Sequence, residues 1–198
     1  MRAIIPSLLL LLFIFVLILT PPHTNGTIHL RIGVIGDSLA QGWGTDNPPH
    51  DKFPMQITIP HHRIVLRDDA TGGATVTDML PYVADLFAFH PDVLVIELGT
   101  NDQRKGHSLT QFQSDYIGIY RAFRGIPYIL CLSLWPSPGY AATAPYNAII
   151  HSICGSGYID ITSIAIPANE TLPENWHPNT HGAALIAGVI ATWIEEHT

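Results

Sequence analysis

Short apolar runs alternate with amphipathic stretches along most of this chain. Five runs are rich in β-branched and aliphatic residues and have the length of β-strands: 28–35, 62–66, 92–98, 126–132 and 158–161. The run DVLVIEL at 92–98 is almost wholly apolar, which is typical of a strand buried on both faces of a parallel sheet. The pattern therefore predicts a largely buried parallel sheet.

Helical spacing fills the gaps between these runs. One apolar stripe recurs at intervals of three and four residues, formed by Leu109, Phe112, Tyr116, Ile119 and Phe123. Ser108 and Gln111 precede it in the spacing of a capping box. Further helices are predicted at 75–87, 144–153 and 182–196. Strands that alternate with helices predict right-handed βαβ units, and so an α/β fold with helices on both faces of the sheet.

The N-terminal segment has a different character. Arg2 is followed by an uncharged apolar run over 3–20, and Pro21 and Pro22 end it. A positive residue before such a run indicates a secretory signal peptide, and its length also suits a membrane anchor. A buried core helix is the third alternative. We expect residues 1–26 to be a leader with a short linker and 27–198 to be one domain outside the cytoplasm, either secreted or associated with a membrane through residues 3–20.

Composition narrows the class of protein further. The 9 basic and 16 acidic residues give a formal charge of −7, which argues against a nucleic-acid partner because such proteins need a basic surface. Hydrophobic residues make up 47% of the chain, so it is not intrinsically disordered. Two cysteines, Cys131 and Cys154, are too few for a disulfide scaffold. Buried free thiols are the default expectation for both, and a disulfide remains open in an oxidising compartment.

Polar residues follow several of the predicted strands. Asp37 and Ser38 come after the first strand, Asp68 to Gly73 after the second, and Asn101 and Asp102 after the third. The segment 174–179 leads into the last helix. Ligands of parallel α/β sheets bind beyond the carboxyl ends of the strands, so these groups are expected on one rim.

Together these groups have the chemistry of acyl transfer. A serine needs a base to take its proton, and histidine suits that task when a carboxylate orients its ring. Ser38, His177 and Glu174 supply these three groups. Oxyanion donors are available in the backbone amides of Ser38 and Gly73 and in the Asn101 side chain. Each motif alone also fits a turn, a helix cap or a packing glycine, and only their joint order along the chain favours catalysis.

Four blocks carry a resemblance to a known family. GDSLAQGWG at 36–44, TGGATVTDML at 71–80, GTND at 99–102 and HPNTHGAALIA at 177–187 resemble the SGNH, or GDSL, hydrolases. The resemblance implies a three-layer, flavodoxin-like α/β/α fold with a five-stranded parallel sheet. It also implies hydrolysis of esters or thioesters through an acyl-enzyme, without a metal or cofactor. By this resemblance Ser38 is the nucleophile, His177 the base, and Gly73 and Asn101 join the Ser38 amide in the oxyanion hole.

The chain departs from the family pattern at two places. The family usually has Asp three residues before the histidine, where this chain has Glu174. Asp160 and a backbone carbonyl are the alternatives for orienting His177. The second block normally has an asparagine before its glycine, and this chain offers Asp68, Asp69 and Thr71 there.

The substrate is expected to be a small-molecule ester. The compact chain resembles lysophospholipase and arylesterase members of the family, and a carbohydrate O-acetyl esterase is the alternative. Four aromatic residues either line an acyl or aryl pocket or pack at its rim: Trp43, Phe53, Trp135 and Tyr140. A non-catalytic binding protein that keeps the fold is the rival from another class. The chain has no G-x-S-x-G or G-x-G-x-x-G motif, and its histidine pairs lack the partners of an obvious metal site.

Overall fold

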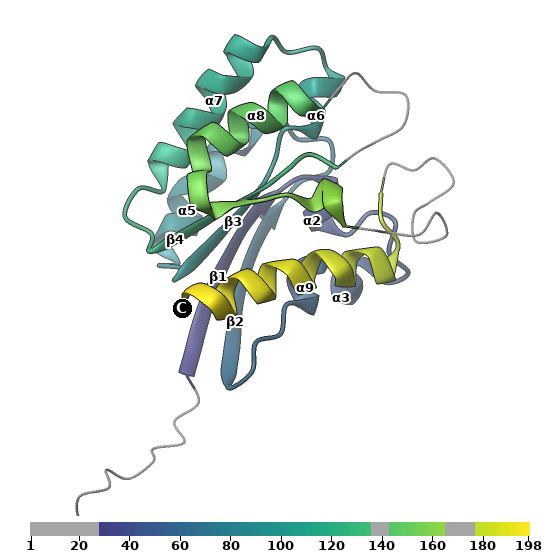
Figure 1. Ribbon diagram of the computed structural model, residues 1–198, viewed down its shortest axis with the longest axis vertical. Coiled ribbons are helices and arrows are strands. Elements are labelled where there is room, and N and C mark those ends of the chain that lie inside the picture. The colour runs from purple at the N-terminus through teal and green to yellow at the C-terminus, as the bar shows by residue number, and fades with distance from the viewer. Residues whose placement is uncertain (1–27, 136–142, 165–176) are drawn as a thin grey trace, which may run out of the picture.

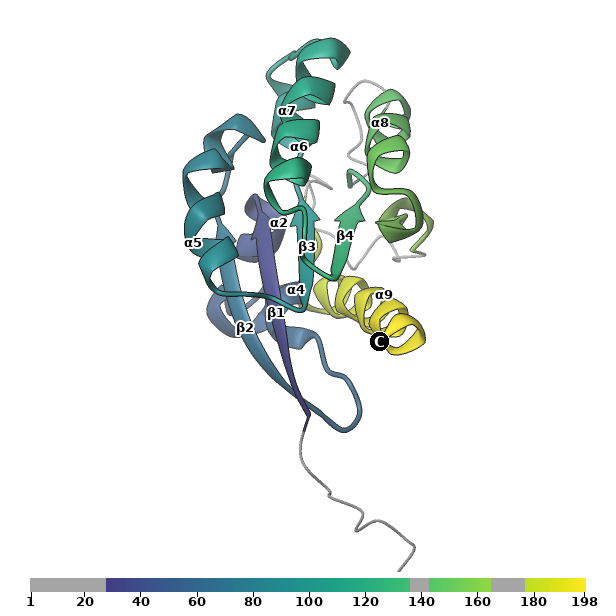
Figure 2. The same cartoon turned by 90° about the vertical axis from the view of Figure 1, so that its left-hand side faces the viewer.

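The protein folds around one five-stranded parallel sheet. The computed structural model describes residues 28–135, 143–164 and 177–198 (Figure 1). The strands lie in the order β2-β1-β3-β4-β5, and all pairs are parallel. Figure 2 shows β2, β1, β3 and β4 side by side in that order. Their bounds are β1 Ile28–Gly36, β2 His62–Ala70, β3 Val93–Glu97, β4 Tyr128–Leu132 and β5 Tyr158–Ile159. This order is that of flavodoxin-like folds, so the predicted fold is confirmed.

Helices cover both faces of this sheet. The α-helices are α2 Ser38–Gln41, α3 Pro48–Asp51, α4 Phe53–Gln56, α5 Val83–Ala88, α6 Thr100–Arg104, α7 Leu109–Ala122, α8 Ala144–Cys154 and α9 Thr180–His197. Three short 3-10 helices are η1 Thr77–Tyr82, η2 Gly155–Gly157 and η3 Ile161–Ser163. In Figure 1, α7 and α8 lie on one side of the sheet and α9 on the other, which gives three layers.

Two hydrophobic cores separate these layers. Successive side chains of a strand point to opposite faces, and β3 shows this plainly. Val93 and Val95 belong to the core beneath α9, whereas Leu94 and Ile96 belong to the core beneath α7 and α8. A strand with both faces covered must be apolar throughout, and this explains the continuous apolar run in the sequence.

Helix α9 closes the domain and sets the position of the segment before it. Ile186, Ile190 and Ile194 recur every four residues and are fully buried against the sheet. Burial of one such side chain contributes roughly 1.5–3 kcal/mol. The Asn179 side chain caps the helix by accepting a hydrogen bond from the Gly182 amide at 2.9 Å. His177, two residues before this cap, is thereby anchored at the rim of the sheet.

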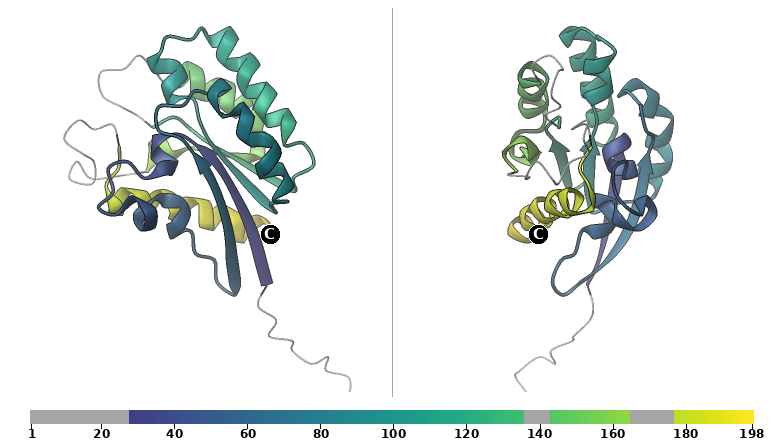
Figure 3. Two further views of the ribbon diagram at one scale, coloured as in Figure 1. Left: turned by 180° about the vertical axis from the view of Figure 1, so that it is seen from behind. Right: turned by 90° about the vertical axis from the view of Figure 1, so that its right-hand side faces the viewer.

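Two predicted elements differ in the structure. The single helix expected at 75–87 is divided into η1 and α5, because Pro81 lacks the amide proton that a continuous α-helix needs. Strand β2 continues beyond the predicted 62–66 to Ala70 and pairs with β1 along its whole length (Figure 3). Asp68 and Asp69 therefore lie within the strand and not in the loop after it. Asp68 forms an ion pair with Lys52 at 2.6 Å.

Helix α7 begins as the sequence predicts, with one difference. The Ser108 hydroxyl accepts a hydrogen bond from the Gln111 amide at 3.2 Å, which confirms the cap. The Gln111 side chain donates to Asp115 at 2.8 Å and does not turn back to Ser108. Only half of the expected capping box is therefore formed.

Cys131 and Cys154 form a disulfide bond. The default expectation of two free thiols is wrong. Cys131 on β4 and Cys154 at the end of α8 face the same core, a proximity that their separation of 23 residues does not reveal. Within the described part of the chain, no helix is both long and apolar enough to cross a membrane.

Candidate active site

The candidate site lies where the order of the strands changes direction. The chain leaves β1 for β2 on one side and later returns to β3 on the other side of β1. Ligands of such sheets bind at this switch point, beyond the carboxyl ends of the strands. Ser38 begins α2 directly after β1, and Asn101 lies in α6 directly after β3. The fold therefore brings together two residues that are 63 positions apart in the sequence.

Gly36 allows the tight turn that presents Ser38. A Cβ atom at this position would lie 2.5 Å from the Ala40 Cβ and 3.1 Å from the Glu97 Oε2. Any side chain would push α2 away from the ends of β1 and β3. The Asp37 carboxylate then caps α2, where its Oδ1 accepts a hydrogen bond from the Leu39 amide at 3.1 Å.

His177 meets Ser38 from the far end of the chain. Its Nε2 lies 2.8 Å from the Ser38 Oγ, although the two residues are 139 positions apart. Both side chains are mostly buried, with 8% of each residue exposed. This distance is within the range for proton transfer from a serine to a histidine base. The Trp43 ring lies beside the imidazole, with 5.7 Å between the ring centroids.

Glu174 lies outside the described residues, so its predicted contact with His177 stays a prediction. Asp160, the alternative carboxylate, is engaged near β5. Its Oδ1 accepts hydrogen bonds from the Thr162 amide at 2.8 Å and the Ser133 hydroxyl at 3.2 Å. Asp160 therefore caps η3 and ties it to the end of β4.

A pocket of about 440 Å³ opens at the Ser38–His177 pair. Its lining residues are Ser38, Trp43, Gly72, Gly73, Asn101, Arg104, Lys105 and His177. Gln41 joins two of its walls, because its Oε1 accepts from the Gly72 amide at 2.8 Å and from the Trp43 indole at 2.9 Å. The sequence did not single out Arg104 or Lys105, because two cations at the end of a short helix form no motif.

Of the four aromatic residues considered for the pocket, Trp43 lines it and is 54% exposed. Phe53 and Trp135 are buried in the core beneath α9 and do not line this pocket, so of the two alternatives they pack and do not bind an acyl or aryl group. Their apolar rings are needed to pack α4 and the end of β4 against this core. Tyr140 lies outside the described residues.

Gly73 and Asn101 reach the pocket where the sequence predicts them. Gly73 has a φ of +80°, a left-handed conformation that glycine adopts without strain. Its carbonyl accepts a hydrogen bond from Lys105 Nζ at 3.1 Å, which links the second block to α6. Ser38, Gly73 and Asn101 all line the same pocket, so the three expected oxyanion donors are brought together.

Two buried acids lie behind the site, and no motif in the sequence assigns either of them a role. Burial raises the pKa of Asp37 to about 6, against hydrogen bonds from Leu39, Glu97 and Ser38 that lower it. Burial, followed by the negative charge of Asp37, raises the pKa of Glu97 well above its ordinary value. Glu97 was detectable as the single inner charge of the apolar run DVLVIEL. Such a residue in a buried strand needs polar partners.

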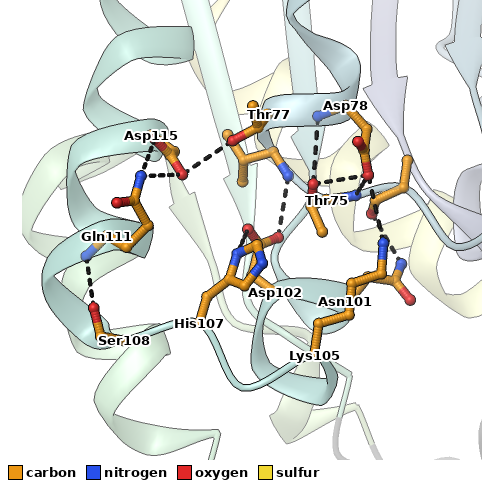
Figure 4. Close-up of polar contacts among 12 residues, drawn as sticks. Thr75, Thr77, Asp78, Asn101, Asp102, Lys105, His107, Ser108, Gln111 and Asp115 are labelled. Carbon is orange, nitrogen blue, oxygen red and sulfur yellow. Dashed lines mark hydrogen bonds and ion pairs between the residues drawn. The ribbon is translucent and has the colours of Figure 1, made fainter.

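One group of metal-ligating residue types occurs in the described part of the chain. The ligand atoms of Asp102, His107 and Asp115 lie within 4.8 Å of one another. Figure 4 shows that these residues also bond to their neighbours. Asp102 accepts from the Val76 amide at 3.1 Å and contacts His107 Nδ1 at 3.1 Å, and Asp115 accepts from Thr77 at 3.0 Å. Hydrogen bonds therefore account for this cluster, and it holds η1, α6 and α7 together.

Comparison with known proteins agrees with this architecture. Residues 34–185 match the GDSL-like lipase/acylhydrolase family. The match includes all four blocks almost to their ends and covers most of the domain. The chain belongs to this family, whose members hydrolyse ester bonds, and the predicted membership is confirmed.

Individual relatives are distant. An acetylxylan esterase of Xylanibacter ruminicola is 23% identical over an alignment of 210 residues. The alignment covers 84% of this chain and 43% of that protein. This chain thus spans less than half of that curated relative. The structure of the psychrotrophic esterase EstA from Pseudoalteromonas sp. matches with a TM-score of 0.70 at 18% identity. The match covers 84% of this chain and 97% of the EstA chain. A family 3 carbohydrate esterase of Clostridium thermocellum also has a TM-score of 0.70 at 18% identity, with coverages of 85% and 96%.

Proposed function

We propose that this protein is a serine esterase in which Ser38 is the nucleophile and His177 the general base. The hydrogen bond of 2.8 Å between His177 Nε2 and Ser38 Oγ carries this proposal. Serine attacks a carbonyl only when a base accepts its hydroxyl proton, and His177 Nε2 is placed to be that base. Membership of the GDSL-like family supports the same reaction class.

The reaction proceeds through an acyl-enzyme. Ser38 Oγ attacks the ester carbon as His177 takes its proton, and the carbonyl oxygen becomes an oxyanion. The Ser38 and Gly73 amides and the Asn101 side chain stabilise this charge. His177 then gives the proton to the departing alcohol oxygen. A water molecule, activated by the same histidine, releases the acid and restores Ser38.

We assign the orientation of the His177 ring to Glu174. A carboxylate on the second ring nitrogen would fix the tautomer and stabilise the imidazolium that forms during attack. The position three residues before His177 supports this assignment. Replacement Glu174→Ala is expected to lower kcat less than Ser38→Ala does, and full activity in that variant would remove Glu174 from the triad.

The pocket favours a short acyl group on a carbohydrate. Among the described residues that line it, none has an aliphatic side chain of the kind that binds a long acyl chain. The exposed Trp43 ring offers a flat apolar surface on which a sugar can stack. The relative named as an acetylxylan esterase supports the same class of substrate. These observations support an O-acetylated saccharide, rather than a lysolipid, as the proposed class of substrate.

Hydrolysis of two sets of esters tests this function. The full chain is assayed with p-nitrophenyl esters from acetate to decanoate and with acetylated xylo-oligosaccharides, with Ser38→Ala as control. We expect the acetate to be the best aryl ester and Ser38→Ala to be inactive. Trp43→Ala should raise KM for the oligosaccharide and leave KM for p-nitrophenyl acetate nearly unchanged. An optimum at long acyl chains would contradict the carbohydrate assignment, and activity that survives in Ser38→Ala would contradict the nucleophile.

We also infer that the domain works outside the cytoplasm. The apolar run at 3–20 supports export, and the Cys131–Cys154 disulfide suits an oxidising compartment. Fractionation of cells followed by N-terminal sequencing of the mature protein tests this inference. Recovery of the protein in the cytosol would contradict it.

A further inference from the structure

The amide nitrogen of Asn101 faces two oxygen acceptors. Its Nδ2 donates to the Asp37 Oδ2 at 2.9 Å and to the Ala74 carbonyl at 3.0 Å. If the amide were turned over, the Asn101 Oδ1 would meet both acceptors with no hydrogen between them. A buried contact of this kind is costly, and Asn101 is only 5% exposed. These two acceptors therefore determine which side of the amide carries the donors.

Asp37 is itself held in a fixed orientation. Its Oδ1 accepts from the Leu39 amide at 3.1 Å and lies 3.4 Å from the Ser38 hydroxyl, which leaves Oδ2 for Asn101. Glu97 supports it from β3, because its Oε2 accepts from the Asp37 amide at 3.1 Å and the Ala40 amide at 3.3 Å. A chain of bonds thus runs from the start of α2 through two buried acids to the oxyanion side of the pocket.

Burial, followed by the charge of Asp37, raises the pKa of Glu97 well above its ordinary value. This direction favours the form of the pair in which Glu97 keeps its proton beside an ionised Asp37. One negative charge then lies behind the oxyanion hole, where two would oppose the developing oxyanion. The neighbouring titratable groups are His177, which lies across the Ser38 hydroxyl, and Tyr116, which faces Glu97 from α7.

We propose that Asp37 is a positioning residue that fixes the direction of the Asn101 side-chain amide, with Glu97 holding Asp37 in place. The proposal rests on the proposed function, which gives Asn101 its use as an oxyanion donor. When the tetrahedral intermediate forms, one N–H of Asn101 stays on Asp37 and the other turns from Ala74 to the oxyanion. The bond to the ionised Asp37 is charge-assisted and therefore the stronger of the two, so the neutral carbonyl gives way.

The isosteric variant Asp37→Asn tests the proposal. The Leu39 amide requires an acceptor, so the new side chain places its oxygen there and turns its NH₂ toward Asn101. Two donors would then face each other, and the Asn101 amide would turn over, so that it could no longer turn an N–H to the oxyanion. We expect kcat to fall by roughly 100- to 1,000-fold, the effect of losing one oxyanion donor, with KM changed less than about threefold.

Glu97→Gln is the matched control. Glutamine mimics the protonated acid, since its oxygen can accept from the Asp37 and Ala40 amides while its NH₂ donates to Asp37. We expect this variant to keep kcat within a few-fold of the wild type. Similar large losses in Glu97→Gln and Asp37→Asn would show that any change in this buried pair harms the fold, and would overturn the proposal.

A double-mutant cycle separates positioning from a general structural effect. Asp37→Asn acts through Asn101, so it should lower kcat little further in an Asn101→Ala background. Equal losses in both backgrounds would overturn the proposal. The cycle requires wild-type ester hydrolysis that Ser38→Ala abolishes. If that activity is absent, it is the proposed function that fails.

One readout needs no turnover and no substitution at Asp37. The Asn101 side-chain NH₂ signals in a ¹H–¹⁵N spectrum, assigned by their loss in Asn101→Ala, should shift as the Asp37 carboxyl carbon titrates. Titration of Asp37 without movement of the Asn101 signals would overturn the proposal. This measurement tests whether Asp37 fixes the Asn101 amide even if Asp37→Asn does not fold or no ester is hydrolysed.

Discussion

At the scale of single residues, the acids behind Ser38 place charge where water cannot reach it. Asp37 and Glu97 are 0% and 2% exposed. Burial disfavours the ionised form of each, and this is the main reason that both pKa values are raised. The folded protein therefore binds protons at these groups more tightly than the unfolded chain does.

This difference makes stability depend on pH in a defined direction. The pKa of Asp37 rises from its ordinary 3.8 to about 6, so its contribution to stability is fully present below 3.8 and is lost as the pH rises through about 6. Asp37→Asn removes that dependence. We expect the free energy of unfolding of the variant, relative to the wild type, to rise between pH 4 and 7 by on the order of 1–3 kcal/mol.

Urea unfolding at several pH values measures this effect. Glu196→Gln is the control for the loss of one carboxyl group, because Glu196 is exposed at the end of α9. A constant difference between Asp37→Asn and the wild type from pH 4 to 7 would contradict the expectation. Together with the expected loss of kcat, a stabilised Asp37→Asn would show that this site trades stability for activity.

At the scale of elements, the disulfide joins β4 to α8. It closes a loop between residues 23 positions apart, and a cross-link over such a loop restricts the unfolded chain. The loop-closure relation gives a stabilisation of about 3 kcal/mol. We therefore expect the reduced protein to unfold at a lower temperature than the oxidised protein, as measured by circular dichroism with and without dithiothreitol.

The double variant Cys131→Ala/Cys154→Ala provides the control for reduction. Its melting temperature should be close to that of the reduced wild type and should not respond to dithiothreitol. Equal melting temperatures for the oxidised and reduced wild type would mean that packing alone fixes α8 on the sheet.

The sequence predicted the elements that have a clear apolar pattern within their own residues. The strands β1 and β3 and the helices α7, α8 and α9 show their apolar periodicity directly, and their bounds differ from the predictions by three residues or fewer. The short helices α3 and α4 were missed, because four residues are too few for a periodic stripe. The full length of β2 was missed as well, because Asp68 and Asp69 are polar and only pairing with β1 keeps them in the strand.

The same distinction applies to the site. Ser38, Gly73, Asn101 and His177 stand in motifs whose order predicts their roles, and the structure gathers them at one pocket. The roles proposed for Asp37 and Glu97 depend on contacts across 60 residues, between the turn after β1 and strand β3, that no local pattern records. Arg104 and Lys105 were missed for the same reason, because only the fold brings the end of α6 to the rim of the pocket.

At the scale of the whole molecule, charge is distributed unevenly. The chain has a formal charge of −7, and only 9 of its residues are basic, yet Arg104 and Lys105 both line the pocket. A cleft lined by cations raises the local concentration of anions. We expect an anionic aryl acetate, 4-acetoxybenzoate, to lose its advantage over its neutral methyl ester when Lys105→Gln or Arg104→Gln is introduced.

The ratio of the two kcat/KM values measures this preference, and it should fall several-fold in the variants and with rising salt. Comparing this ratio between the wild type and each variant cancels the intrinsic reactivity of the two esters. It also cancels any effect of the substitution on Gly73 that changes both rates equally. Arg63→Gln is the control, because Arg63 lies at the start of β2, at the opposite end of the sheet from the pocket. A ratio that responds to neither salt nor substitution would exclude an electrostatic role for the two cations.

The distance along the chain between Ser38 and His177 also matters during synthesis. The serine leaves the ribosome 139 residues ahead of the histidine, and their contact requires α9 to pack on the finished sheet. A nascent or partly folded chain therefore carries Ser38 without His177, and by the proposed mechanism we expect it to be enzymatically silent. A protease cut between the two separates them unless the fragments stay associated. Ester hydrolysis consequently reports on the integrity of the whole domain, from its first strand to its last helix.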